Sequence, residues 1–392
     1  MTIMSSKESF DKPYYVPRAL DLQALLGRKS HFLLGPRQTG KSTLIRHALP
    51  GVRIYNLLDS ATFLTLSRQP ERIAQELTAK DKIIVIDEIQ RLPELLNEVH
   101  LLMEEKGVRF LLTGSSARKL RRGGVNLLGG RARVRHLHPF IRQELGDRFD
   151  ITKALTRGLI PSIYFSDDPE EDLKAYAGAY LQEEIIAEGA TRNAPAFSRF
   201  LRVAALCNAT IVNFTNVASD AQVPRTTVHE YFQILKDTLI ITELPAWKKT
   251  SKRKPLSSSK YYFFDIGVAR HLQGRFLISP GTPEYGEAFE TWMMHELHSY
   301  SDYRSGTKLS FWRSASGYEV DVIMDDHTAI ELKAAENVPA RELKSLMALA
   351  EEGKMKRYIC VCCESRRRTV NGITVLPWQE FLEALWAGEF DI

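Results

Sequence analysis

The fold is decided by residues 31–49, which read HFLLGPRQTGKSTLIRHAL. The run fits the pattern G-x-x-x-x-G-K-[ST] between an apolar strand and a helix, the context in which such a loop binds phosphate. Its backbone N–H groups would close around phosphate oxygens at the positive end of the helix. We expect Lys41 to reach the β and γ phosphates and Ser42 to hold magnesium. The predicted nucleotide-binding set is Gly35, Pro36, Arg37, Gln38, Thr39, Gly40, Lys41, Ser42, Thr43 and Asp87.

Two further apolar runs end in polar residues. Residues 82–88, KIIVIDE, read as a buried strand, and a parallel sheet places the C-terminal ends of its strands at the ligand crevice. Asp87 suits a second magnesium contact, and Glu88 can orient the water that attacks the γ phosphate, so the pair favours hydrolysis over binding alone. Residues 110–116, FLLTGSS, present Ser115 at the same edge, where it could sense the γ phosphate, orient the water or cap the next helix.

Composition sets the outer limits. The 392 residues are 44% hydrophobic and 26% charged, with a net charge of +5, which is ordinary globular usage and enough chain for two to three domains. No apolar run approaches the ~18 residues of a membrane helix, and the first residues lack the apolar stretch of a secretory signal. The four cysteines show no metal-ligand spacing. We therefore expect a cytoplasmic protein without membrane association.

Hydrophobic patterning predicts an α/β fold in three parts. The first part is a parallel sheet with a helical lid over residues 1–190, the second a helical region over 191–273, and the third a smaller α/β domain over 274–392. Expected strands of the first part are 31–34, 53–57, 82–87 and 109–113, and the lid covers 139–189. Expected elements of the third part are helices 285–300, 340–352 and 378–387 and strands 308–313, 319–324, 328–334 and 357–363.

Residues 14–190 resemble an AAA+ ATPase, with Walker A at 35–42, Walker B at 83–88 and a sensor-like strand at 110–116. The resemblance implies ATP and Mg²⁺ as cofactors, Glu88, Lys41 and Ser115 as catalytic residues, and a homo-oligomer, typically a hexamer-like ring. An arginine of one subunit would then complete its neighbour's site. The candidates are Arg131, Arg133 and Arg135, with Arg131 favoured. A solvated or DNA-facing basic segment is the alternative.

Positive charge gathers in two runs that contain no acidic residue. Residues 109–142 carry nine Lys and Arg, and residues 248–260 carry six. Local fields of one sign are what phosphate backbones select, although exposed solubilising loops would look the same. The second run follows residues 213–235, whose apolar spacing predicts a helix–turn–helix opening its second helix at Pro224.

This arrangement reads as a winged helix, with the basic loop as the wing and the start of the second helix on DNA. Winged helices also dock proteins or act as lids in ATPases, which is the competing interpretation. The predicted DNA contacts are Arg118, Arg121, Arg122, Arg225, Thr226, Thr227, Lys248, Lys249, Lys252 and Arg253.

An acidic hairpin lies in residues 319–333, EVDVIMDDHTAIELK. Strict alternation would place Asp321 on one face, put Val320, Val322, Ile330 and Leu332 on the other, and set Asp321 opposite residue 331 or 332. Opposed carboxylates repel unless a cation separates them, which suggests Mg²⁺ or Mn²⁺, with Lys333 near the reacting water. An exposed strand face on which Lys333 offsets both acids is the alternative.

With the surrounding helix and strand order, this hairpin resembles the PD-(D/E)XK core of restriction endonucleases, a superfamily that also has members that bind without cutting. The resemblance implies a nuclease-like set of Asp321, Glu331 and Lys333, and metal ligands Glu290 (or Glu287), Asp321 and Glu331. The other predicted metal contacts are Ser42 and Asp87 in the first domain.

Taken together, YVPRAL, GPRQTGKS, VIDEIQ, LTGSSARKL, YYFFDIGVARHL and EVDV…IELK resemble a family of largely uncharacterised bacterial and archaeal ATPases. We expect an oligomeric ATPase that binds and remodels or processes DNA, duplex or branched, with a metal-dependent nuclease-like domain. The alternative is a nucleotide-controlled switch whose second and third domains dock proteins.

Overall fold

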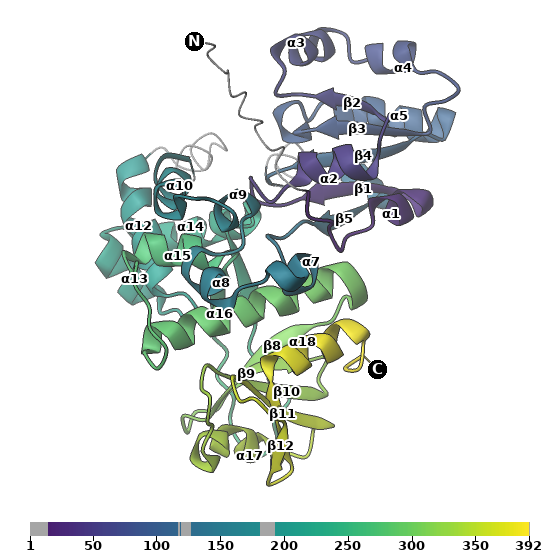
Figure 1. The fold of residues 1–392 in the computed structure, drawn as a ribbon. Helices are drawn as coiled ribbons and strands as arrows, with labels where there is room; N and C mark the ends of the chain where they lie inside the picture. The colour runs from purple at the N-terminus through teal and green to yellow at the C-terminus, as the bar shows by residue number, and fades with distance from the viewer. Residues whose placement is uncertain (1–14, 117, 119–126, 181–192, 392) are drawn as a thin grey trace, which may run out of the picture.

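The computed structural model describes residues 15–116, 118, 127–180 and 193–391. The chain runs from a sheet at the top right of Figure 1, through a group of helices, to a second sheet at the bottom. The long helix α16 (Pro283–Tyr300) lies across the middle, between the two sheets. Within the described residues, no helix has both the length and the apolar content needed to span a bilayer.

The N-terminal sheet has five parallel strands in the order β2-β3-β4-β1-β5. They are β1 (Ser30–Leu34), β2 (Arg53–Asn56), β3 (Ile83–Asp87), β4 (Arg109–Gly114) and β5 (Ala132–His136). The first four confirm the predicted strands. Because β4 lies between β1 and β3, the loop after β1 and the polar ends of β3 and β4 meet at one edge.

Strand β5 was not predicted, because residues 132–136 looked only basic. Ala132 and Val134 are the members that pack against the apolar core, whereas the alternate residues Arg133 and Arg135 face away from it. An edge strand needs only one apolar face, so two small hydrophobes suffice here.

Helices cover both faces of this sheet, with α1 on one face and α5 on the other contributing to separate apolar clusters. Asp21 and Asp59 cap the first turns of α1 and α3 by accepting backbone hydrogen bonds. The helical segments are α1 (Leu22–Arg28), α2 (Lys41–Ala48), α3 (Ser60–Arg68), α4 (Arg72–Glu76), η1 (Ile89–Arg91), α5 (Leu95–Lys106) and η2 (Leu127–Gly130).

The middle of the chain is helical, as predicted. The described part of the expected lid folds as α7 (Arg142–Leu145), η3 (Gly146–Arg148), α8 (Ile151–Arg157), α9 (Pro161–Tyr164), α10 (Pro169–Ala175) and η4 (Tyr176–Tyr180). It is followed by α12 (Ala194–Leu206), α13 (Phe214–Ala221), α14 (Arg225–Asp237), the antiparallel pair β6 (Ile241–Leu244) and β7 (Lys260–Phe263), and α15 (Ile266–Gln273).

The second sheet has six strands in the order β12-β13-β11-β10-β9-β8 and mixes parallel with antiparallel pairs. Its elements are η5 (Ser301–Ser305), β8 (Leu309–Arg313), β9 (Glu319–Met324), β10 (Thr328–Lys333), η6 (Ala340–Leu343), α17 (Lys344–Ala350), β11 (Arg357–Cys362), β12 (Arg368–Val370), β13 (Ile373–Pro377) and α18 (Trp378–Ala387). The hairpin β12–β13 was not predicted.

The strict alternation predicted for β9 is wrong. The register against β8 shifts between Ser310 and Trp312, so two residues of β9 oppose one of β8. Such a bulge changes the direction of the side chains beside it. Val320 accordingly packs with Ile323 in one cluster, whereas Val322 packs in the cluster on α16.

One apolar cluster crosses the boundaries between the three predicted parts, although both faces of the N-terminal sheet and one face of the C-terminal sheet have clusters of their own. A single cluster of buried side chains extends from the lid through α12, α14 and α15 to α16 and α18. The loop between β6 and β7 also crosses into the C-terminal sheet: Trp247 N–H donates to Phe311 O at 2.6 Å, and Leu256 N–H donates to Arg313 O at 2.9 Å. We call residues 245–256 the docked loop.

Candidate functional site

The loop between β1 and α2 is shaped by two glycines. Gly40, at φ +93°, precedes the first turn of α2, and a Cβ on Gly35 would lie 2.4 Å from the carbonyl oxygen of Leu137. Lys41 folds back, and its ammonium donates to the carbonyls of Gly35 (2.6 Å) and Pro36 (3.1 Å). The cation is therefore already held over the loop where a phosphate would lie.

Asp87, at the end of β3, faces this loop. Its carboxylate accepts hydrogen bonds from the hydroxyls of Ser42, at 3.1 Å, and Thr113. A hydroxyl and a carboxylate from two elements thus form a pair of hard oxygen donors, the chemistry that Mg²⁺ prefers. The contact of Thr113 with Asp87 was not predicted. Its position at the end of β4, two residues before Ser115, was the signal that could have indicated it.

Glu88 takes the left-handed conformation at φ +62°, which is strained for a residue with a side chain and typical of functional positions. Its carboxylate accepts a hydrogen bond from the amide of Gln90, and the same amide lies 3.1 Å from Ser115 Oγ. A Cβ on Gly114 would lie 2.4 Å from Gln90 Oε1, so glycine leaves room for this amide. The structure brings Glu88 and Ser115 together through Gln90, which was not predicted.

A cavity of about 680 Å³ opens beside the loop. Gln38, Gly40 and Thr43 line its loop side, and the opposite side is largely apolar, with Val16, Phe140, Pro161 and Phe165. Tyr15 stacks on His47 of α2 with ring centroids 3.8 Å apart. The cavity has the size and the mixed lining of a small-molecule site.

Arg18 connects this cavity wall to the loop. Its guanidinium donates to Thr39 O (2.6 Å), to His138 O (2.6 Å) and to the Glu144 carboxylate (2.8 Å). The side chains of Arg18 and Glu144 are only 3% and 1% exposed. Arg18 thus fixes the loop against the segment that follows β5. The sequence did not predict this role, because the partners of Arg18 are distant along the chain.

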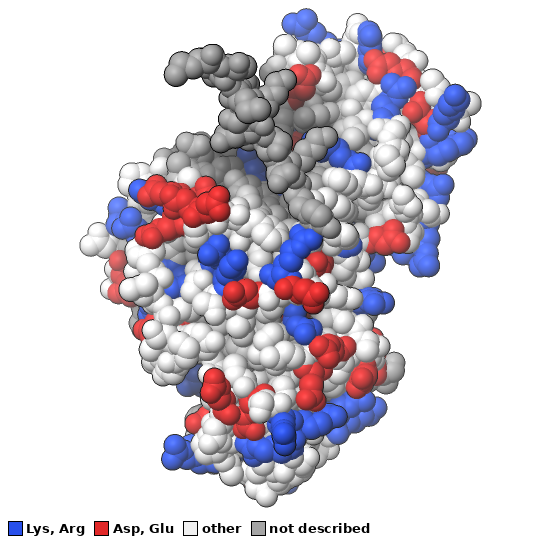
Figure 2. Space-filling model, viewed as in Figure 1, with Lys and Arg blue, Asp and Glu red and all other residues white. Residues whose placement is uncertain are grey.

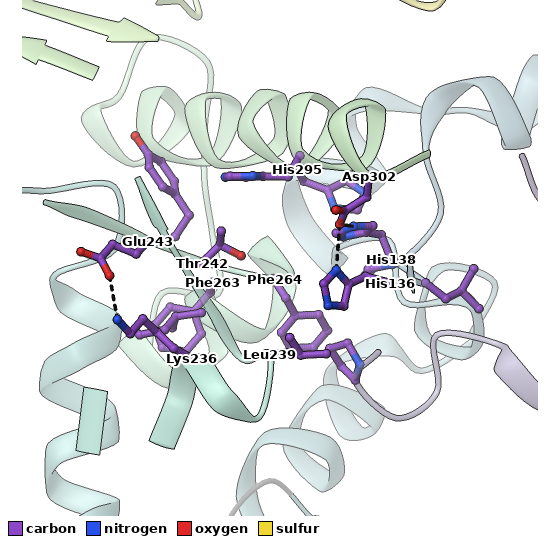
Figure 3. Close-up of a pocket in the computed structure, with 16 residues that line it drawn as sticks. His136, His138, Lys236, Leu239, Thr242, Glu243, Phe263, Phe264, His295 and Asp302 are labelled. Atoms are coloured by element: carbon purple, nitrogen blue, oxygen red, sulfur yellow. Dashed lines mark hydrogen bonds and ion pairs between the residues drawn. The ribbon is translucent and has the colours of Figure 1, made fainter. Parts of the chain in front are cut away.

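Behind the loop lies a second cavity, of about 300 Å³, lined by Pro36 and by residues from β5, β6, β7 and α16. Figure 3 shows His136 and His138 reaching Asp302 on one side and Lys236 paired with Glu243 on the other. Burial lowers the pKa of His295 to about 3, so its ring is neutral near pH 7. The cavity touches the nucleotide-type loop and the buried helix at once.

The acidic residues predicted in the third part do come together. Extending the β9–β10 register by one residue sets Asp321 opposite Glu331, and Leu332 N–H donates to Asp321 Oδ2 at 2.8 Å. Lys333 pairs with Glu331 at 2.7 Å, and burial followed by Asp321 raises the pKa of Glu331 well above its usual value. Glu290 of α16 joins this group, whereas Glu287 instead contacts Arg275.

An unpredicted cation, Lys260 of β7, lies within this carboxylate cluster, which we define as Glu290, Glu319, Asp321 and Glu331. Its Nζ lies 2.6 Å from Glu319, 3.2 Å from Glu290 and 3.7 Å from Asp321, and the side chain is 3% exposed. Burial lowers the pKa of Lys260, but the three carboxylates raise it above its usual value overall.

The cluster in this arrangement does not fit a metal ion, because the ammonium occupies the space between the carboxylates that a cation would need. In the described part of the chain, no three His, Cys, Asp or Glu side chains are placed to hold a metal. Tyr262, two residues along β7, donates to Glu290 at 2.6 Å and further restricts that carboxylate.

The predicted DNA contacts have different surroundings. Arg225 and Thr226 are exposed at the start of α14, and Thr227 is half-buried. Lys248 is exposed. Arg118, in contrast, is buried and pairs with Asp237 of α14 at 3.5 Å, so it does not present its charge to a DNA surface. Arg121 and Arg122 lie outside the described residues.

The basic loop predicted as a wing is held on the C-terminal domain through its backbone. The Glu352 carboxylate accepts backbone N–H bonds from Ser251, Lys252 and Arg253, at 2.8 to 3.0 Å. Lys249 pairs with Asp326 at 2.6 Å. The loop is thus anchored mainly through its backbone, and the side chains of Lys248, Lys249 and Lys252 remain exposed. Figure 2 shows positive and negative side chains interspersed over the face in view.

The candidate arginine for a neighbour's site, Arg131, is exposed and pairs with Glu104 of its own chain. Arg133 is exposed and Arg135 half-buried on β5.

Comparison with known proteins supports one part of this picture. Residues 27–146 match the family described as an AAA domain, and residues 148–277 and 285–381 match two families described as domains of unknown function. The matched AAA segment contains the whole loop and both carboxylates after β3. Together with the parallel five-stranded sheet, the match identifies an α/β AAA domain of the P-loop type.

Two uncharacterized proteins, from Mycobacterium tuberculosis and Mycobacterium bovis, are each 26% identical over 319 residues, which is 78% of this chain and 70% of theirs. Similar solved structures include the Aeropyrum pernix ORC1 protein in complex with DNA, at 14% identity and a TM-score of 0.31, covering 67% of this chain and 94% of that one. The replication initiator DnaA bound to AMPPCP and single-stranded DNA is 13% identical, with a TM-score of 0.29, covering 57% and 90%.

Replacing Lys260 by methionine tests its place in the cluster. We expect Lys260→Met to lower the free energy of unfolding by about 3 to 5 kcal/mol at pH 8, because buried carboxylates lose their cation. Burial raises the pKa of Glu290 to about 7 even beside Lys260, and removing the lysine raises it further. A carboxyl with a raised folded pKa stabilises the fold at low pH and loses that contribution as pH rises through the folded pKa. The loss should therefore shrink at pH 5.5.

Urea unfolding at both pH values measures this effect, with the exposed Lys354→Met as the matched control. A loss that is the same at pH 5.5 and pH 8 would contradict the electrostatic account.

Proposed function

We propose that this protein hydrolyses ATP at the loop 35–43 and uses the nucleotide cycle to act on DNA as a homo-oligomer. The observation that carries the proposal is the convergence, at one sheet edge, of Lys41 over the loop, the Ser42–Asp87 pair and Glu88. Nucleotide binding needs only the loop. Hydrolysis needs in addition a carboxylate that can handle the attacking water, and Glu88 lies next to the Ser42–Asp87 pair.

The chain's own groups divide the work as follows. Loop N–H groups and Lys41 bind the phosphates, and the cavity lined by Val16, Phe140 and Phe165 accepts the base. Ser42 and Asp87 would hold Mg²⁺, which neutralises phosphate charge when bound. Glu88 orients the attacking water and accepts its proton, while Gln90 positions the Glu88 carboxylate and Ser115.

In a ring of such subunits, Arg131 is our candidate for completing the neighbour's site. It is exposed, and its pairing with Glu104 involves two surface side chains, an interaction that is weak enough to exchange. A hexamer-like ring is the arrangement that the AAA resemblance favours.

We place DNA at the start of α14, in a winged-helix arrangement. Arg225 and Thr226 are exposed there, next to the half-buried Thr227, and α13 leads into α14 through the turn at Gln222. Helix starts of this kind meet the groove and backbone of duplex DNA. Lys248, in the docked loop after β6, adds a further exposed positive charge. The backbone of the docked loop is hydrogen-bonded to the C-terminal sheet.

A second candidate function is favoured by one observation, the position of Lys260 in the carboxylate cluster. In this alternative the protein is a nucleotide-controlled switch, and the PD-(D/E)XK-like domain docks a partner rather than cutting DNA. Cleavage with Mg²⁺ or Mn²⁺ by Asp321, Glu331 and Lys333, aided by Glu290, stays a prediction from the sequence, and the arrangement of Lys260 disfavours it.

Hydrolysis is tested by Glu88→Gln. We expect ATP turnover to fall at least about 100-fold while ATP binding is kept, because only the group that handles the water's proton is lost. Phosphate release and calorimetric binding of a non-hydrolysable ATP analogue measure the two effects. Glu105→Gln, an exposed position on α5, is the control. Unchanged turnover would remove Glu88 from the reaction.

DNA binding is tested by Arg225→Ala. We expect the affinity for duplex and branched DNA to fall about three- to tenfold, and the slope of log K against log salt to decrease by about one, since one phosphate contact is lost. Fluorescence anisotropy over a salt series measures both, with the exposed Arg366→Ala as control. No DNA affinity at low salt, with or without ATP, would leave the switch as the better function.

DNA cleavage by the C-terminal domain is tested by incubating labelled junction DNA with Mg²⁺ or Mn²⁺. We expect wild type and Asp321→Ala to leave the DNA equally intact, because Lys260 occupies the space between the carboxylates that a metal ion would need. Cutting by wild type that disappears in Asp321→Ala would show instead that the cluster is a nuclease site.

A further inference from the structure

A third cavity, of about 570 Å³, lies against strand β5 and beside helix α1. It is formed by α1, the edge of the N-terminal sheet and η5, and four arginines line it: Arg28, Arg133, Arg135 and Arg304. We call it the basic cavity. It is separate from the loop 35–43, none of whose residues line it.

The N-terminal sheet places two arginines and one histidine of this cavity on one face. Arg133 and Arg135 are two residues apart on β5 and so point the same way. His31 is the register partner of Arg133 on the neighbouring strand β1 and lies on the same face. Strand geometry, rather than flexible loops, therefore sets the spacing of this group.

The fourth arginine is held in place by η5. Asp302 accepts from His138, at 2.6 Å, and lies 3.2 Å from His136, as Figure 3 shows for the labelled groups. Tyr303 OH accepts from His138 N–H at 3.0 Å. These contacts fix η5 against the end of β5, so Arg304 remains beside Arg133 and Arg135.

Positive charge in the basic cavity is not neutralised. Arg28, Arg133 and Arg304 are exposed and Arg135 is half-buried. Among the described residues, none of the four has a carboxylate within ion-pair distance. The acid that lines the cavity, Asp21, is engaged in capping α1, where it accepts from Ala24 N–H at 2.9 Å. Four like charges gathered at one cavity give it a positive potential that favours a bound anion.

His31 gives an independent sign of a ligand. It is 2% exposed and lines the cavity; its Nδ1–H donates to Lys29 O at 2.9 Å, but its Nε2 has no partner among the described residues. A buried polar atom without a partner can form the missing hydrogen bond with a bound group, and His31 Nε2 is such an atom on a residue that lines the basic cavity.

We propose that the basic cavity binds an anion carrying at least two phosphate groups. Guanidinium forks match phosphate oxygens two at a time, and four of them exceed what one phosphate can satisfy. The negative charge of bound phosphate favours protonation of the His31 imidazole, and its Nε2–H can then donate to a phosphate oxygen of either ligand. The ligand is either a free polyphosphate compound or consecutive backbone phosphates of a nucleic acid, which share this chemistry.

The test uses the full chain with Lys41→Ala, so that the loop 35–43 contributes little, and inorganic tripolyphosphate as the probe. Calorimetry should give one site per chain. Arg133→Ala/Arg135→Ala should weaken binding at least about 30-fold and Arg304→Ala about tenfold, since charge-assisted bonds are lost. All three side chains lack ion-pair partners, so these variants should unfold at the same temperature as the parent. Arg341→Ala/Arg366→Ala, which removes the same charge from exposed positions, should change affinity less than about twofold.

A second arm measures duplex DNA by anisotropy, with tripolyphosphate as competitor. Loss of both tripolyphosphate and DNA binding in Arg133→Ala/Arg135→Ala supports the site with nucleic acid as its source of phosphate. Loss of tripolyphosphate binding alone supports it with a free polyphosphate. Unchanged tripolyphosphate affinity overturns the proposal, as does an equal loss in the Arg341→Ala/Arg366→Ala control. ATP turnover is measured for Arg133→Ala/Arg135→Ala in the chain that keeps Lys41. If this variant loses turnover while its tripolyphosphate affinity is unchanged, the two arginines act on a neighbour's nucleotide instead.

Discussion

Helix α16 is buried over most of its length, and a buried polar group is costly unless it finds a partner. Three of its charged or polar side chains meet groups from the lid and from β7. Glu290 is met by Lys260 and Tyr262, and Glu296 accepts from Arg142 N–H at 2.7 Å. His295 donates to Phe140 O at 2.9 Å. These contacts therefore join the segment after β5 and strand β7 to one helix.

This dependence links the nucleotide-type loop to the distant sheet by contact. Leu137 leaves β5 under Gly35, and the next residue, His138, reaches Asp302 just after α16. These contacts connect the loop to α16, whose Glu290 lies in the carboxylate cluster. The contacts supply a route; a change in function would further require two arrangements of α16, each favoured by a different nucleotide state.

Sequence reasoning succeeded where the determinants are local. The loop 35–42, the apolar strand ending at Asp87 and the hairpin turn at Asp325 each depend on residues adjacent in the chain, so pattern and spacing predict them. It missed Lys260, Gln90 and Arg18, because their meaning comes from partners far away in sequence or from side-chain direction. It also missed β5, whose alternating arginines concealed an edge strand.

The two basic runs show why charge counts along a chain are an incomplete guide. In the docked loop Lys249 pairs with Asp326 and Arg253 with Glu351, so these charges have acidic partners within the chain, and backbone hydrogen bonds hold the loop on the C-terminal domain. On β5 no such acids are within reach of Arg133 and Arg135 among the described residues. A run of lysines and arginines predicts an interface in both cases, but only the neutralising partners decide whether that interface lies within the chain or remains open to a ligand.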